Sequence, residues 1–115
     1  MADDPSELER KLEALRAAYA DNLGTKMREL QSAVQNLQDG TSAEDAHGAL
    51  QAIHAHAHKL TGSALTFGFP RIGEIARELE ERRFELLREP GLPPGAIQTI
   101  SGLLAGLGDA IENRD

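Results

Sequence analysis

Apolar residues recur at intervals of three and four along most of the chain, and this spacing predicts amphipathic helices. No stretch alternates apolar and polar residues as a half-buried strand does. The predicted helices cover about residues 6–22, 25–37, 42–67, 70–87 and 97–111. Gly24 is expected to break or bend the chain between the first two helices, because glycine is about 1 kcal/mol less favourable than alanine inside a helix.

Each predicted helix has one apolar stripe, which should face a common core. On the third helix, at about 100° per residue, the stripe covers one face along the whole length. The expected core residues are Leu8, Leu12, Leu15, Tyr19, Met27, Leu30, Val34, Leu37, Ala46, Ala49, Leu50, Ile53, Ala57, Leu60, Ala64, Phe67, Ile72, Ile75, Ala76, Leu79, Phe84, Leu86, Leu87, Ile97, Ile100, Leu104, Leu107 and Ile111.

Turn-forming residues separate the later helices. Thr41 or Ser42 is expected to cap the third helix, Gly68 to end it, and Pro70 to occupy the first turn of the next helix, where proline is tolerated. Residues 89–95 form a loop rich in proline and glycine. Short connections between amphipathic helices favour an all-α, antiparallel up-down four-helix bundle. The segment 6–22 is expected as an additional N-terminal helix, and residues 1–115 as a single domain.

The composition argues against several classes of ligand and chemistry. The net charge of −7 argues against nucleic acid and anionic membranes, and a 3% aromatic content argues against base stacking. The chain has no cysteine, which excludes disulfides and thiol chemistry. The acidic N-terminus lacks a signal peptide's apolar region, and no apolar run reaches membrane-spanning length. These features predict a cytoplasmic protein. The apolar stripes are expected to be buried inside the bundle, which predicts a monomer.

Four histidines lie on the third predicted helix, and they allow three interpretations. His58 lies about 120° from the centre of the apolar face, with His54 one turn before it and His47 further along the same stripe. His56 lies near the edge of the buried face. The histidines could be ordinary polar surface positions, or His54 and His58 could bind zinc, although their stripe offers no third ligand. The remaining interpretation is a phosphate-accepting histidine.

The residues around His58 suit phosphate acceptance. Imidazole is a good nucleophile near neutral pH, because its unperturbed pKa is about 6.5. Gly62, one turn later, removes the side chain that would otherwise stand beside the ring. Lys59 could neutralise a phosphate on the imidazole. Thr61 and Ser63 offer hydroxyl groups at the edges of the same region.

Three segments resemble the histidine-containing phosphotransfer (HPt) domain of bacterial phosphorelays: HKLTGSA at 58–64, FG at 67–68, and IGEIARELE at 72–80. The resemblance is strongest over about residues 50–80. It implies a four-helix bundle with His58 as the exposed phospho-acceptor, Gly62 as clearance for a partner and Lys59 as the nearby cation. The family often has lysine three residues after the histidine, where this chain has Thr61.

The resemblance also implies a function and its partners. The chain would be a phosphocarrier rather than an enzyme, passing a phosphoryl group between His58 and the aspartate of a response-regulator receiver domain, with a hybrid histidine kinase upstream. It would hold no metal or cofactor of its own, because the magnesium ion is expected on the receiver. Thr61, Ser63, Leu65 and Phe69 are the expected docking residues, Leu65 lying only about 20° from His58. A non-phosphorylated docking module with the same fold is the alternative.

Overall fold

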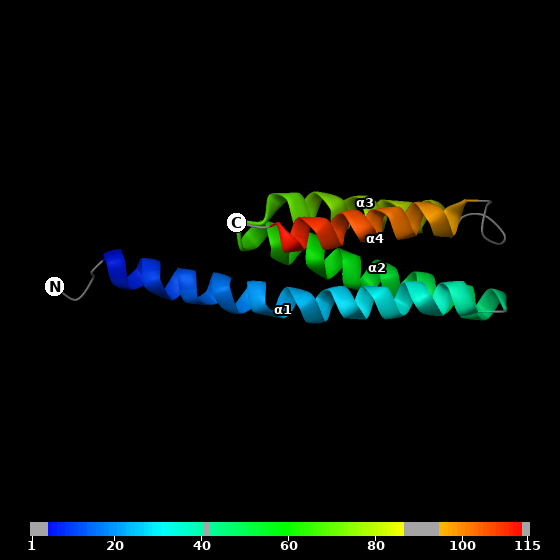
Figure 1. The fold of residues 1–115 in the computed structure, drawn as a ribbon, viewed down its shortest axis with the longest axis horizontal. Coiled ribbons are helices and arrows are strands. Elements are labelled where there is room, and N and C mark those ends of the chain that lie inside the picture. Colours follow the sequence, from blue (N-terminus) through cyan, green and yellow to red (C-terminus); the bar gives the residue numbers. More distant parts are fainter. Residues whose placement is uncertain (1–4, 41, 87–94, 114–115) are drawn as a thin grey trace.

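The computed structural model describes residues 5–40, 42–86 and 95–113, which form four helices. They are α1 (Pro5–Asp39), α2 (Ala43–Thr66), α3 (Pro70–Leu86) and α4 (Ala96–Glu112). Each helix runs antiparallel to the one before it (Figure 1). α1 and α3 both pack against α2 and α4, which closes the bundle. The all-α four-helix prediction is confirmed.

The additional N-terminal helix is the part of the fold prediction that is wrong. Residues 5–39 form one continuous helix of 35 residues, about 52 Å long at 1.5 Å per residue. Gly24 does not interrupt it, because the buried stripe continues on both sides with Leu23 and Leu30. Packing of this stripe outweighs the roughly 1 kcal/mol that a single glycine removes from helix propensity.

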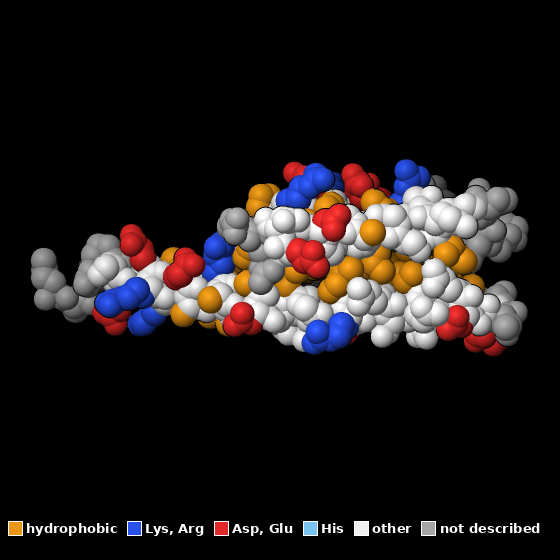
Figure 2. Space-filling view, viewed as in Figure 1, with side chains coloured by type: hydrophobic (Ala, Val, Ile, Leu, Met, Phe, Trp, Pro, Cys, Tyr) orange, Lys and Arg blue, Asp and Glu red, His pale blue; other side chains and the backbone are white. Residues whose placement is uncertain are grey.

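The core lies between the inward faces of the four helices. Its largest fully buried side chains come from all four, and Figure 2 shows apolar atoms along the seam above α1. The predicted stripes of α2 and α4 form the core with few exceptions, and Ile72, Ile75, Ala76 and Leu79 are buried on α3. The side chains of Phe84, Leu86 and Leu87, and most of the predicted loop at 89–95, lie outside the described residues.

The first ten residues of α1 after Pro5 extend beyond the bundle (Figure 1). Every side chain from Ser6 to Leu15 is exposed, and the relative exposure of Leu8, Leu12 and Leu15 is 57–61%. Figure 2 shows apolar atoms at the surface there, among charged side chains. These leucines were expected in the core, and that expectation is wrong because no other described helix reaches them. The apolar stripe at Leu8, Leu12 and Leu15 is therefore not buried by the bundle. The monomer was predicted from burial of all the stripes, and it stays a prediction.

Local chemistry fixes both ends of α2 and the start of α3. Ser42 caps α2, its side-chain oxygen accepting a hydrogen bond from the Asp45 backbone N–H at 3.1 Å. Thr41, the other expected cap, lies outside the described residues. Gly68 ends α2 with φ +83°, a left-handed conformation that favours glycine, and Pro70 begins α3. These boundaries confirm the predictions and place α3 directly beside α2.

Tyr19 joins α1 to the end of α2. Its ring stacks on Phe67 at 4.6 Å between centroids, and its hydroxyl shares a 2.7 Å hydrogen bond with Ser63 Oγ. Burial raises the pKa of the Tyr19 phenol above its ordinary value of 10.0, and the hydrogen bond with Ser63 opposes part of that rise. The fold therefore favours the neutral phenol.

We expect the stability contributed by neutral Tyr19 to be present below pH 10 and to fall as the pH rises through the higher pKa of the folded chain. The chain has one tyrosine and no tryptophan, so the absorbance of tyrosinate reports Tyr19 alone. The titration midpoint should be higher in the native chain than in denaturant. A Tyr19→Phe variant should lose the matching part of the alkaline fall in unfolding free energy. Equal midpoints in both conditions would contradict the assignment.

Candidate functional site

His58 stands on the exposed side of α2, toward the edge shared with α3. Its side chain is 69% exposed, whereas Ala57 and Leu60 beside it belong to the core. The apolar face of α2 packs against the bundle and thereby holds the histidine stripe outward. The predicted position of His58 on the flank of the apolar face is confirmed.

Glu80 of α3 contacts the imidazole of His58. The distance from His58 Nδ1 to Glu80 Oε2 is 2.6 Å, and the Glu80 side chain is only 21% exposed. An ionised carboxylate can only accept hydrogen bonds, so Nδ1 must carry the proton and donate it. In the neutral ring the lone pair is then on Nε2. Glu80 thus fixes the ring orientation and the nitrogen that carries the lone pair.

Glu80 is not among the site residues predicted from the sequence. It lies 22 residues after His58 and on another helix, so helical spacing within α2 could not reveal it. The available signal was the Leu79-Glu80 pair at the end of the family-like segment, where Leu79 is buried and the next residue turns toward α2. A carboxylate one position after a core leucine is a common surface arrangement, so the pair alone did not indicate a role.

Gly62 leaves open space one turn after His58. A Cβ atom built at Gly62 meets no other atom within 4 Å, apart from its chain neighbours and the helix backbone. The fold itself therefore has no steric need for glycine here. Gly73 of α3 differs, because a Cβ there would lie 3.0 Å from Leu65 Cγ and 3.4 Å from the Thr61 carbonyl oxygen. Gly73 permits α3 to approach α2 closely, and Gly62 keeps the surface beside His58 flat.

The two hydroxyl groups near His58 are engaged inside the fold. Thr61 Oγ1 donates to the Ala57 carbonyl oxygen at 2.8 Å, and Ser63 Oγ pairs with the Tyr19 hydroxyl. Both residues are half-buried. Lys59 is exposed and forms no ion pair with the described part of the chain. Lys59 is therefore the group beside His58 that is free to meet an anion.

The two apolar docking candidates lie in different environments. Leu65 is 54% exposed while one side of its side chain packs against Gly73, so it combines a surface position with contact to the next helix. Phe69 is buried, stacked with Tyr19 at 5.9 Å and covered by the Arg16 guanidinium at 4.4 Å from the ring centroid. Its ring closes the core under α1, and its expected docking role stays a prediction.

The other histidines differ in their contacts. His47 is exposed, and His56 Nδ1 lies 3.5 Å from Glu29 Oε2 of α1. The rings of His54 and His58 stack with centroids 6.0 Å apart. Within residues 5–40, 42–86 and 95–113, no group of three or more potential ligands is close enough to hold a metal ion. None of the helices described is long and apolar enough to cross a membrane.

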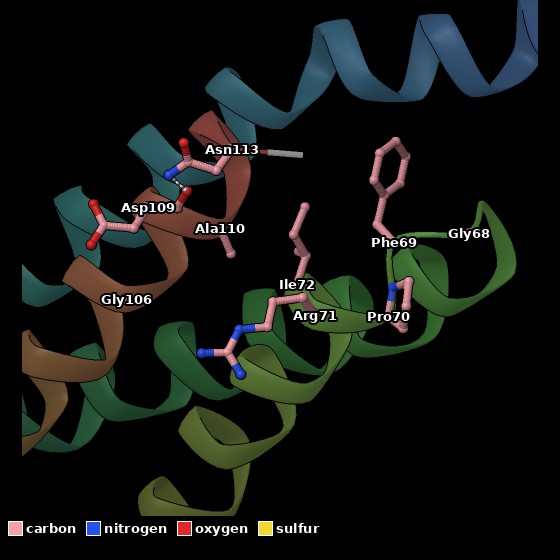
Figure 3. A pocket seen from close by; sticks show the side chains of 9 residues that line it. All are labelled: Gly68, Phe69, Pro70, Arg71, Ile72, Gly106, Asp109, Ala110 and Asn113. Atoms are coloured by element: carbon pink, nitrogen blue, oxygen red, sulfur yellow. Dashed lines mark hydrogen bonds between the residues drawn. The ribbon is translucent and has the colours of Figure 1, made fainter. Parts of the chain in front are cut away.

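A cavity lies away from His58, at the end of the bundle (Figure 3). It has a volume of about 410 Å³ and is lined by the α2–α3 turn, the start of α3 and the last turns of α4. The Asn113 side chain at its rim donates to the Asp109 carbonyl oxygen at 2.8 Å. None of His58, Lys59 and Gly62 lines this cavity, and all three are exposed at the surface of α2.

Comparison with known proteins identifies a family over nearly the whole chain. The model of the Hpt domain family matches residues 6–113, which include all of α2, α3 and α4 and nearly all of α1. Neither a curated protein nor a solved structure matches the chain.

In a Glu80→Ala variant, neutral His58 should no longer prefer the tautomer with its hydrogen on Nδ1. The reason is that the substitution removes the carboxylate 2.6 Å away, and water offers no equivalent bias. Nitrogen-15 NMR of the imidazole measures the tautomer directly. Glu80→Gln keeps an acceptor oxygen and should retain the preference. Glu78→Ala, at an exposed position on the same helix, is the matched control. Unchanged His58 nitrogen shifts in Glu80→Ala would show that Glu80 does not set the tautomer.

Proposed function

The chain belongs to the Hpt domain family of histidine phosphotransfer modules, which carry phosphoryl groups in phosphorelays and are not kinases, and we propose that His58 is its phospho-acceptor. The supporting observation is the contact between His58 Nδ1 and Glu80 Oε2 at 2.6 Å. It leaves the lone pair on Nε2 of a side chain that is 69% exposed, and in-line attack on phosphorus requires such a lone pair. The other three histidines have no carboxylate at such a distance among the described residues.

The proposed reaction is reversible transfer with the aspartyl phosphate of a receiver domain. Nε2 of His58 attacks phosphorus, the N–P bond forms as the acyl P–O bond breaks, and the receiver aspartate leaves as a carboxylate. No proton needs to move, because Nδ1 keeps its hydrogen. The ring gains positive charge during attack, and the Glu80 carboxylate faces that charge. Positioning and electrostatics are the main sources of catalysis in phosphoryl transfer, so a single placed imidazole suffices.

Hpt domains interact with receiver domains, and we propose a docking surface for this chain around His58. It consists of the open surface at Gly62, the free ammonium of Lys59 and the exposed part of Leu65. Thr61 and Ser63 border it, and their hydroxyl groups serve internal hydrogen bonds. A hybrid histidine kinase is the proposed upstream partner, and the cytoplasm the proposed location. A magnesium ion is expected on the receiver.

The test of His58 is phosphotransfer from a phosphorylated receiver domain, with His58→Gln as the control. Wild type should acquire a labelled phosphoryl group whose bond is labile in acid and stable in base, as expected of phosphohistidine. The variant should acquire none, because it lacks the imidazole. A wild-type chain that binds a receiver but takes no label from it would indicate a docking module without transfer. Label that persists in His58→Gln would place the acceptor elsewhere.

Gly62→Ala should stabilise the fold and slow transfer. The methyl group meets no atom within 4 Å, so unfolding free energy should rise by up to about 1 kcal/mol from helix propensity. In the docked complex the same methyl group would crowd the receiver, and overpacking of this kind should slow transfer about tenfold. Gly48→Ala is the matched control, since Gly48 is also exposed on α2 with nothing within 4 Å. It should stabilise similarly and leave transfer unchanged. Equal transfer rates for the two variants would refute the clearance role.

A further inference from the structure

His54 carries a polar atom that the fold leaves without a partner. Its Nδ1 is buried and makes no hydrogen bond, and within the described residues it is the only such side-chain atom. An unpaired buried polar group destabilises the fold, and a leucine or alanine at this half-buried position would avoid that cost. A buried atom of this kind needs an explanation beyond packing.

The lack of a partner at Nδ1 indicates which nitrogen of His54 holds the proton. A buried N–H without an acceptor is rarer in proteins than a buried acceptor without a donor. Neutral His54 should therefore keep the lone pair on buried Nδ1 and carry its hydrogen on Nε2, at the far end of the ring. His58 has the opposite tautomer, because its Nδ1 donates to Glu80. The two rings thus present a donor and a nucleophile side by side.

The two imidazoles are neighbours on one face of α2. They are nearly parallel, with 17° between their planes and 6.0 Å between their centroids. A phosphoryl group bonded to Nε2 of His58 would therefore have the His54 ring beside it. A hydrogen bond of about 2.9 Å from His54 Nε2–H to a phosphoryl oxygen requires the His54 ring to turn toward that group.

We propose that His54 is a positioning residue that binds the phosphoryl group on His58, through a hydrogen bond from His54 Nε2–H to a phosphoryl oxygen. This inference rests on the proposed role of His58 as the phospho-acceptor. The hydrogen bond forms only after transfer, so it stabilises the phosphorylated chain relative to the free one. His54 thereby raises the share of phosphoryl groups that this chain holds at equilibrium with a receiver, and it slows their loss to water.

The test labels the chain with phosphoramidate, a small phosphoryl donor that requires no receiver, and follows the decay of phosphohistidine. A hydrogen bond to a charged group should make the half-life about fivefold longer in wild type than in His54→Leu, whereas His54→Gln keeps an N–H donor and should stay within about twofold of wild type. His47→Leu, an exposed position on the same helix, should decay as wild type does. Leucine removes the unpaired Nδ1, so His54→Leu should unfold at the same or higher denaturant concentration.

Nitrogen-15 NMR of the unphosphorylated chain gives a second readout, in which His54 should have its hydrogen on Nε2. Equal half-lives for wild type, His54→Leu and His47→Leu, with label present on His58, would overturn the role of His54 and leave the proposed function intact. A His54 hydrogen on Nδ1 would overturn the role of His54 as well. Failure to label wild type, or equal labelling of His58→Gln, would instead overturn the assignment of His58.

Discussion

The close approach of α2 and α3 is the constraint on which the candidate site depends. A Cβ atom at Gly73 would be in tight contact with Leu65 at 3.0 Å, and small residues at Ala57, Ala64 and Ala76 are fully buried in the core. Because the helix backbones can come this near, a glutamate on α3 reaches a histidine on α2 at hydrogen-bond distance. A wider separation would leave the imidazole free to rotate and the proton free to occupy either nitrogen.

The apolar periodicity of the sequence predicted much of the fold, because burial on one face is recorded directly in residue spacing. The α2 and α4 stripes are core residues in the structure, and Gly68 and Ser42 mark the ends of α2. Gly24 was misjudged because helix propensity is a weak local preference that packing of a long stripe overrides. The exposure of Leu8, Leu12 and Leu15 could not be foreseen from the pattern, since it depends on where the other helices end.

Some features of the candidate site follow from the geometry of one helix, and others depend on contacts between helices. His58 and Gly62 lie on one helix, so their relation follows from turn geometry and was predictable. The partner of His58, the burial of Phe69 and the internal hydrogen bonds of Thr61 and Ser63 all depend on contacts with α1, α3 or the helix's own backbone. Hydroxyl groups that a helical wheel places near His58 are engaged within the fold, and the carboxylate that contacts His58 comes from another helix.

The extension of α1 beyond the bundle has a consequence for how the chain unfolds. No core contact holds residues 6–15, so their helix is maintained by intrinsic propensity and by local pairs such as Glu7 with Lys11. A helical segment of this length is marginal in water without tertiary support. It should therefore fray from its N-terminal end outside the cooperative transition of the bundle. Circular dichroism would register its loss as a gradual slope before the main transition, whereas a probe at Tyr19 would record only the bundle.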